Sequence, residues 1–323
     1  MVMAKLNMVD AINLALKQEM KKDPKVIVLG EDVGVDGGVF RVTEGLLDLY
    51  PDRVFDTPLA ESGIVGASIG LALGGMKPVC EIQFDGFTYP ALDQLISHAS
   101  RIRTRTRGKF GCQMVLRFPC SGGIKALEHH SESPESYYIH TPGLKVVMPS
   151  TPYDAKGLLI SAIRDQDPVI FMEPKRVYRA IKEEVPEKEY TIPLGQAEVK
   201  KEGKDVTLIS WGAMVRECQA AAAEAEESCE VIDLRTLKPF DIDTILKSVK
   251  KTGRAVIVHE APRTCGLGAE LSAQLMEKVL LDLKAPVQRV TGFDTVIPLA
   301  KLEKYYLPDK EKIKKTVKDL MKF

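Results

Sequence analysis

Regular alternation between short apolar runs and amphipathic segments is the feature that most constrains the fold of this chain. Residues 145–148, 153–164 and 169–172 follow one another as a strand, a helix and a second strand. Such a succession is typical of a βαβ unit, in which a crossover helix joins two parallel strands. Because the alternation continues on either side of this unit, the sequence predicts a mostly parallel sheet flanked by helices.

The same patterns divide the chain into two parts. In the first part, further strands are predicted at 26–29, 77–84 and 114–118, and helices at 11–21 and 89–103. In the second part, strands are predicted at 206–210, 230–234 and 255–259, and helices at 214–227, 266–281 and 309–323. Proline and charged residues dominate the stretch between them. We therefore predict two α/β domains, residues 1–178 and 205–323, joined by a surface linker over 179–204.

Bulk composition argues against several classes of protein. The 323 residues carry 45 basic and 45 acidic side chains, so no net charge favours nucleic acid or a membrane surface. No apolar run reaches the roughly 20 residues that span a bilayer, and the first 20 residues have the pattern of an amphipathic helix, not of a signal peptide. Six scattered cysteines without a C-x-x-C pair predict reduced, mostly buried thiols and a cytoplasmic location.

One carboxylate, Glu61, stands at the start of an otherwise apolar, glycine-rich segment over residues 57–75. Gly66, Gly70 and Gly74 recur every four residues, so they share one helical face that another backbone could approach closely. An acid beside such a face must be protonated, paired or hydrogen-bonded to a ligand. The pattern is compatible with an acid that acts on a group held between two protein surfaces. The alternative is a first-turn glutamate that only complements the helix dipole.

A second candidate site is the glycine-rich, polar segment over residues 121–133, which follows a predicted strand. His129 and His130 lie there among carboxylates and could transfer protons near neutral pH. The alternative is a solvated loop whose histidines bond only to its own turns. Nucleotide binding by this chain alone is disfavoured, because neither G-x-G-x-x-G nor a P-loop occurs and Glu31 and Asp32 stand where a phosphate would sit.

Taken together, these segments resemble the β subunit of the thiamine-diphosphate-dependent decarboxylase component of 2-oxo acid dehydrogenase complexes, of the pyruvate or branched-chain type. The resemblance spans essentially the whole chain and rests on ordered motifs at 29–33, 57–75, 81–84, 130–135, 142–147, 154–159 and 233–239. It implies a transketolase-like pyrimidine-binding domain, with a mostly parallel sheet, followed by a transketolase carboxyl-terminal α/β domain. The cofactor would lie between this subunit and an α subunit.

The resemblance also implies roles for three residues. Glu61 would hydrogen-bond the ring nitrogen of the cofactor's aminopyrimidine and stabilise its imino tautomer, whose exocyclic nitrogen removes the thiazolium proton. Phe87 would lie against the pyrimidine ring. His130, in the sequence His-Ser-Glu-Ser, would orient groups or move protons while the acyl group passes to lipoamide.

A structural potassium ion, held largely by backbone carbonyls, is a further implication of the resemblance. The matching positions are Met114, Ala162, Ile163, Asp165 and Asp167. Asp167 stands where the family often has asparagine, which weakens its assignment as a ligand. The alternative for residues 165–168 is ordinary turn chemistry.

One motif of the family is missing. No Gly-Asp-Gly, which anchors magnesium and diphosphate in enzymes of this type, occurs in the chain. By the resemblance, the α subunit supplies that half of the site in an α2β2 heterotetramer, and this chain is inactive alone. The carboxyl-terminal domain, with the helix ending at Phe323, would dock the acyltransferase component. An acetoin dehydrogenase β subunit and a non-catalytic docking subunit stay open as alternatives, whereas the missing motif argues against a self-sufficient transketolase.

Overall fold

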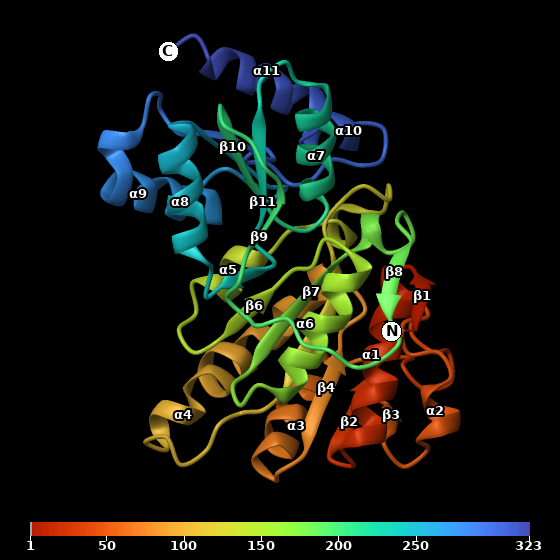
Figure 1. Ribbon diagram of the computed structural model, residues 1–323. Coiled ribbons are helices and arrows are strands. Elements are labelled where there is room, and N and C mark those ends of the chain that lie inside the picture. The colour runs from red at the N-terminus through yellow and green to blue at the C-terminus, as the bar shows by residue number, and fades with distance from the viewer. Residues whose placement is uncertain (1) are drawn as a thin grey trace.

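The computed structural model describes residues 2–323 (Figure 1). They form two adjoining α/β halves, the first mainly from the amino-terminal part of the chain and the second mainly from the carboxyl-terminal part. The first half is built on a seven-stranded sheet with the strand order β12-β6-β7-β5-β4-β2-β3. Its strands are β2 (Val26–Gly30), β3 (Val54–Asp56), β4 (Lys77–Glu81), β5 (Val115–Cys120), β6 (Lys145–Val147), β7 (Val169–Pro174) and β12 (Thr236–Lys238). All neighbours are parallel except β12 and β6, which confirms the mostly parallel sheet.

Helices cover both faces of this sheet because its strands are apolar on both sides. In β5, Val115 packs with the residues of α1 (Met8–Lys22) and α6 (Pro152–Arg164), whereas Leu116 packs on the opposite face with those of α3 (Glu61–Leu73). Successive side chains of a strand point to opposite faces, so a strand buried on both faces has a continuous apolar run. The short helix α2 (Leu46–Leu49) lies beside β3.

The second half repeats the plan on a smaller scale. Its five-stranded sheet has the order β14-β13-β10-β11-β9. The strands are β9 (Glu198–Lys201), β10 (Val206–Ser210), β11 (Cys229–Asp233), β13 (Ala255–Val258) and β14 (Gln288–Val290). The helices are α7 (Met214–Glu224), α8 (Ile242–Thr252), α9 (Leu267–Val279), α10 (Glu303–Tyr306) and α11 (Lys310–Leu320). As the sequence predicts, α11 buries Ile313, Val317 and Leu320, and it packs on α7.

Two predicted elements differ from the structure. The single helix predicted over 89–103 is broken into a 3-10 helix (η1, Asp85–Ala91), a π-helical turn (η2, Gln94–His98), a second 3-10 turn (η3, Ala99–Arg101) and a short α-helix (α4, Ile102–Arg105). Pro90 has no backbone N–H to donate, which helps to explain why a continuous α-helix does not form. At the amino terminus, β1 (Met3–Leu6) precedes α1, whereas the sequence predicted a helix from the first residue.

The two halves exchange strands. Within the stretch predicted as a linker, β8 (Glu183–Pro186) pairs with β1, and β9 joins the second sheet. In the other direction, β12 leaves the second half to pair with β6 at the edge of the first sheet. The remaining short elements are η4 (Glu128–His130), α5 (Glu135–Ile139), η5 (Lys175–Val177) and η6 (Leu280–Asp282). These crossings bind the two halves into one body.

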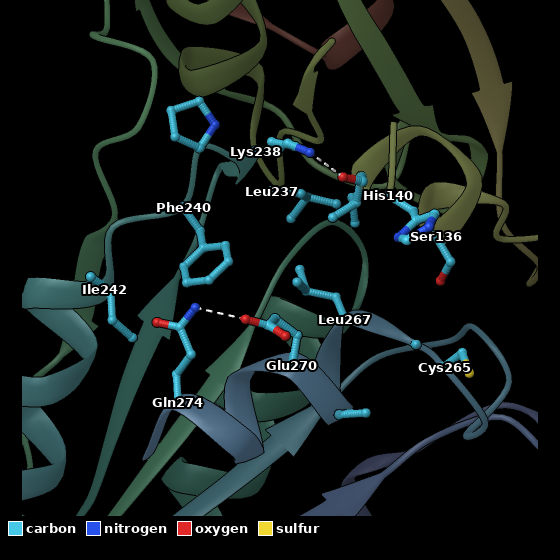
Figure 2. A pocket seen from close by; sticks show the side chains of 14 residues that line it. Ser136, His140, Leu237, Lys238, Phe240, Ile242, Cys265, Leu267, Glu270 and Gln274 are labelled. Carbon is cyan, nitrogen blue, oxygen red and sulfur yellow. Dashed lines mark hydrogen bonds between the residues drawn. The ribbon is translucent and has the colours of Figure 1, made fainter. Parts of the chain in front are cut away.

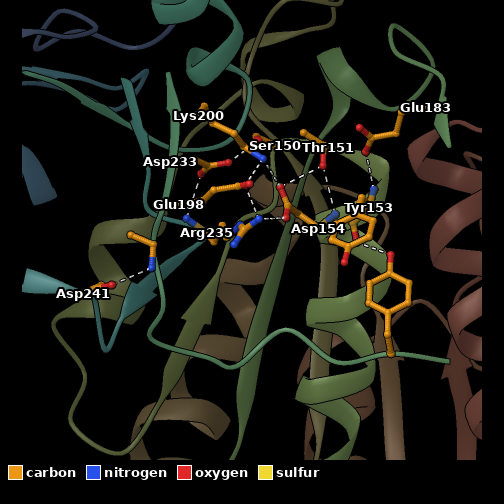
Figure 3. A network of polar contacts seen from close by, with 12 residues as sticks. Ser150, Thr151, Tyr153, Asp154, Glu183, Glu198, Lys200, Asp233, Arg235 and Asp241 are labelled. Carbon is orange, nitrogen blue, oxygen red and sulfur yellow. Dashed lines mark hydrogen bonds and ion pairs between the residues drawn. The ribbon is translucent and has the colours of Figure 1, made fainter. Parts of the chain in front are cut away.

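Charged side chains seal the contact between the halves (Figure 3). Asp154 of α6 is fully buried, and its two carboxylate oxygens lie 2.6 Å from Arg235 Nη2 and 3.1 Å from Lys200 Nζ. Glu198 accepts from the same two cations, and Ser150 donates to Asp233. Asp154 and Glu198 therefore each have cationic partners, whereas Asp233 is bonded to a hydroxyl and burial raises its pKa to about 7.

Two further predictions concern the chain as a whole. Five of the six cysteines are buried, Cys265 is exposed, and all six are free thiols, as the sequence predicts. Among residues 2–323, no helix is both long enough and apolar enough to cross a bilayer.

Candidate active site

Four segments that carry candidate residues leave the same edge of the first sheet. Glu31 follows β2, Glu61 follows β3 after four residues, Phe87 lies on η1 after β4, and His130 lies in the loop after β5. The carboxyl ends of parallel strands meet at one edge of a sheet, and ligands of α/β proteins bind there. The topology thus explains why residues far apart in the sequence reach one region.

Phe87 and His130, which the sequence predicts in one site, are in contact. Their ring centroids lie 5.1 Å apart, and His130 also packs edge-on against Phe84 at 4.3 Å. The Nδ1 atom of His130 is buried without a hydrogen-bond partner among the described residues. Burial lowers the pKa of His130, and the nearby charges of His129 and Lys175 lower it further. The imidazole is therefore neutral near pH 7, with a ring nitrogen free to bond to a ligand.

Two acids, Glu31 and Glu61, lie close enough for their charges to interact. Glu61 is half-buried at the first turn of α3, and Glu31 is 4% exposed with neither carboxylate oxygen bonded within residues 2–323. Burial raises the pKa of Glu31 to about 7, and the charges of Glu61 and Asp32 add to the rise. The charge of Glu61 therefore disfavours ionisation of Glu31, which keeps its proton up to near neutral pH.

A buried ion pair lies next to the aromatic cluster formed by Phe84, Phe87 and His130. Lys175 Nζ lies 2.8 Å from Asp85 Oδ1, and both side chains are fully buried. The same ammonium lies 5.8 Å from the centre of the Phe84 ring, which is the ring that packs on His130. Burial raises the pKa of Asp85 to about 6 even though Lys175 acts in the opposite direction. This pair fixes the start of η1, because Asp85 is its first residue.

A second buried charge cluster joins the ends of three neighbouring strands. Arg117 of β5 donates through Nε and Nη2 to the Glu173 carboxylate of β7, at 2.7 and 2.8 Å, and through Nη1 to Glu81 of β4. Neither cluster was identified from the sequence. A charged residue at the end of an apolar strand was the available signal, but it does not reveal which partner faces it across the sheet.

The three backbone positions predicted to bind potassium lie close together, near the start of β5 and the end of α6. The carbonyl of Met114 accepts from Val169 N at 3.0 Å, that of Ala162 accepts from Asp165 N at 3.2 Å, and Gln113 Nε2 donates to the carbonyl of Ile163 at 3.0 Å. A carbonyl oxygen has a second lone pair, so each could still ligate a hard cation.

The two carboxylates predicted at the same ion already have cationic partners. Lys145 Nζ lies 2.6 and 2.8 Å from the oxygens of Asp165, and Arg103 Nε lies 2.6 Å from Asp167 Oδ1. A potassium ion there would face an ammonium and a guanidinium. The donor set therefore fits a cation through its carbonyls, and the carboxylates fit it less well.

The larger cavities lie elsewhere. One of about 770 Å³ opens between α5 and α9 at the junction of the halves, where Lys238 donates to the carbonyl of Ile139 (Figure 2). Another, of about 850 Å³, lies beside it. Neither is lined by Glu61, Phe87 or His130.

Two family models match most of the chain. The model described as transketolase, pyrimidine binding domain, matches residues 4–181, and the one described as transketolase, C-terminal domain, matches residues 195–313. A solved split-gene transketolase, described as an inactive beta4 tetramer, superposes with a TM-score of 0.80 over 99% of each chain. At 23% identity, this likeness shows the fold alone.

Much closer relatives exist among characterised sequences. The chain is 54% identical over 324 residues to the pyruvate dehydrogenase E1 component subunit beta of Acholeplasma laidlawii, with 99% of each chain covered. It is 53% identical to the corresponding protein of Staphylococcus epidermidis and 50% identical to that of Bacillus subtilis, over 99% of this chain and 100% of theirs. This chain belongs to the pyruvate dehydrogenase E1 beta family. The resemblance and the transketolase-like two-domain fold predicted from the sequence are both confirmed.

The predicted site residues of this E1 beta chain fall into two groups. Phe87 and His130 are in contact, and Glu61 lies beside a second acid that sequence reasoning had considered only as an obstacle to phosphate. That second acid, Glu31, lies within the first motif of the resemblance, so the available signal was its position directly after a buried strand. The residues predicted around potassium form a separate group.

Proposed function

We propose that this chain is the β subunit of a pyruvate-decarboxylating enzyme and contributes the aminopyrimidine half of a thiamine diphosphate site. The observation that carries the proposal is the half-buried Phe87 ring, held against His130 at the sheet edge where Glu61 begins α3. An aromatic ring, an acid and a free imidazole nitrogen match the chemistry of an aminopyrimidine. The relatives at 50–54% identity act as pyruvate dehydrogenase components by name, which favours pyruvate over branched-chain 2-oxo acids.

When bound, thiamine diphosphate would supply the centre that accepts the electron pair released with carbon dioxide. The residues of this chain would control protons and position. Glu61 would hold a hydrogen bond to the pyrimidine ring nitrogen, and the raised pKa of Glu31 would keep a proton available beside it. His130, neutral because burial lowers its pKa, would accept or donate a proton at its free ring nitrogen while the acyl group leaves for lipoamide.

The rest of the site would come from an α subunit. This chain has no Gly-Asp-Gly, so magnesium and the diphosphate would be held by the partner in an α2β2 assembly. In support, Gly70 of α3 and Gly74, which caps the helix, are exposed, and a Cβ added at Gly70 would meet nothing within 4 Å. A bare face on the helix that begins at Glu61 is suited to a partner helix. The acyltransferase component would dock on the carboxyl-terminal half, and the assembled enzyme would work in the cytoplasm.

The decisive experiment replaces Glu61 with glutamine and reconstitutes the chain with its α subunit. We expect decarboxylation of pyruvate to fall by about a hundredfold or more, because the amide cannot transfer the proton that the carboxylate does. Glu277→Gln, at an exposed position of α9, is the matched control and should keep full activity.

The same assay separates the alternatives. Undiminished activity of the Glu61→Gln enzyme would support a docking subunit whose Glu61 only complements the helix dipole. Turnover of acetoin, or of branched-chain 2-oxo acids in preference to pyruvate, would assign the chain to a sister enzyme.

We further propose that potassium, if bound, is held mainly by the carbonyls of Met114, Ala162 and Ile163. Thermal unfolding in potassium chloride and in choline chloride at equal ionic strength tests this. A ligand that binds only the folded state raises Tm in proportion to the logarithm of its concentration, so Tm should rise selectively with potassium. Identical curves in the two salts would remove potassium from the description of this chain.

A further inference from the structure

The loop that carries the two histidines is closed at its base and divided into two limbs. Ser121 N donates to the carbonyl of Glu132 at 2.7 Å, and the Ser121 and Ser133 hydroxyls lie 3.2 Å apart. One limb, residues 122–125, runs along the second half of the molecule. The other carries His129 and His130 in η4. With the base closed, the position of one limb constrains that of the other.

The backbone of the first limb is strained. Ser121 and Lys125, which are not glycines, have φ of 70° and 60°, and Gly123 between them has φ of 95°. Such conformations persist only where the surroundings impose them, and they cluster at functional sites. The chain therefore needs contacts that hold residues 121–125 in place.

Two carboxylates of the second half supply such contacts. Gly122 N donates to Glu260 Oε2 at 2.9 Å. Gly123 N donates to Glu303 Oε1 at 2.8 Å, and Lys125 N donates to Glu303 Oε2 at 3.1 Å. Glu260 follows β13 and Glu303 begins α10, so both come from the half of the chain that contains none of the predicted cofactor residues. We call Glu260 and Glu303 the carboxylate clamp.

The clamp is buried and closely packed. Glu260 is 6% exposed and Glu303 is 5% exposed. A side chain added at Gly122 would come within 3.0 Å of Ile297 and 3.1 Å of Leu307, so the second half leaves room there for backbone only. Burial raises the pKa of Glu260 to about 7, although the Gly122 N–H and the charges of Arg176 and Lys175 oppose the rise. Burying two acids this far is costly, and the loop amides offset part of that cost, as do the charges of Arg176 and Lys175 near Glu260.

We propose that Glu260 and Glu303 are positioning residues, which hold the loop over 121–133 in the conformation that presents His130 to the cofactor. The step from loop to chemistry rests on the function proposed above for His130. The hydrogen bonds and the strained backbone are independent of it. In this arrangement the carboxyl-terminal half contributes to the active site through the loop amides, without a residue of its own at the cofactor.

Hydrogen exchange of the assembled enzyme, read by mass spectrometry on peptides within 120–133, tests the clamp directly. In the double variant Glu260→Ala, Glu303→Ala, we expect these amides to exchange about tenfold faster, because each loses its acceptor. In each single variant, only the amides that donate to the replaced residue should exchange faster. Glu277→Ala, an exposed glutamate of α9, is the matched control and should change nothing in the loop.

Conservative variants distinguish positioning from general damage. Glutamine keeps one acceptor oxygen, and Glu260 accepts from the loop through Oε2 alone, so Glu260→Gln should restore most of the protection at Gly122 and most of the kcat for pyruvate. Glu303 accepts through both oxygens, so Glu303→Gln should protect only one of the two amides that Glu303 holds. In the alanine variants, kcat should fall about tenfold or more with KM nearly unchanged, since the loop is needed for proton transfer. Should the double variant not fold, the single variants give the same readings.

Unchanged exchange in the alanine variants would overturn the proposal, as would a Glu260→Gln variant as impaired as Glu260→Ala. Faster exchange with full activity would overturn the role in catalysis while leaving the clamp in place. Failure of the proposed function itself would appear differently, as an active Glu61→Gln enzyme.

Discussion

Glu31 shows how a single buried acid links this fold to pH. Its pKa is raised from 4.5 to about 7, so the folded chain binds this proton more tightly than the unfolded chain does. The stability that the bound proton provides is complete below about pH 4.5 and is lost as the pH rises through 7. At pH 8 the ionised carboxylate is a net cost to the fold.

We therefore expect Glu31→Gln to stabilise the chain at pH 8 and to change its stability little near pH 4.5. Glutamine has a similar shape but no charge to bury. Urea denaturation of wild type and variant at the two pH values measures the effect. Equal stabilisation at both would show that ionisation of Glu31 does not matter. Asp36→Asn, at an exposed position of the same segment, serves as the control.

The site residues differ in how far sequence alone could identify them. Glu61 and His130 lie in ordered motifs, and Phe87 follows one at a fixed distance, so a resemblance was enough to select them. Lys175 and Asp85 are 90 residues apart in sequence, and no motif connects them. Their pairing is decided by which strands are neighbours in the sheet, which composition and periodicity do not specify.

Among the elements, α3 has the most unusual surface. It begins at Glu61, buries Ile64, Val65, Ser68 and Ile69, and leaves Gly70 and its capping residue Gly74 exposed. Alanine has a higher helix propensity than glycine, and a Cβ at Gly70 would meet nothing within 4 Å.

Gly70→Ala should therefore stabilise the free chain by roughly 0.5–1 kcal/mol and weaken its association with the α subunit. Chemical denaturation measures the first effect, and sedimentation of the mixed subunits measures the second. Normal association of the variant would show that the glycine face of α3 is not a contact between subunits.

The ends of an element could be predicted where a helical spacing of apolar residues coincides with a capping residue. The helix α6 follows Thr151, whose side chain accepts from Asp154 N, and Pro152 stands at its first position. Between Tyr89 and Arg103, the apolar spacing is helical, but the chain passes through 3-10, π and α turns. Tertiary contacts with α3 and η4 decide the geometry there, and a local pattern does not encode them.

On the scale of the whole molecule, stability depends on the polar network between the halves. Asp154 is fully buried and the side chain of Arg235 is 10% exposed. Removing Arg235 takes away the closer of the two cations that Asp154 contacts and leaves Lys200 at 3.1 Å, so the buried carboxylate is only partly compensated.

We expect Arg235→Met to lower the free energy of unfolding by about 3 kcal/mol, in the range for broken buried pairs. Lys315→Met is the matched control, because Lys315 pairs with Asp319 while its side chain is 80% exposed, and we expect no measurable loss. Urea denaturation of the three proteins decides between these outcomes. A loss as small as that of the control would show that the network does not join the halves.

The division into two α/β units could be predicted because the alternation of strand-like and helix-like segments stops between them. The exchange of strands between the two units could not be predicted. Residues 179–204 are rich in charge, yet they contain β8 and β9, whose partners are β1 and β11. A short strand without an apolar run is stabilised by its partners, and the partners of β9 and β12 lie outside their own sequence neighbourhood.

The strand β12 has a consequence for any attempt to produce the first half alone. It covers the outer edge of β6, whose Val146 and Val147 are fully buried. Without residues 236–238, the row of backbone N–H and C=O groups along β6 would be open to pairing with any passing strand. A fragment ending near residue 181, although it matches a complete family model, would then be prone to aggregate through that edge. By pairing with β6, the second half of this chain thus also prevents the first half from associating with itself through that edge.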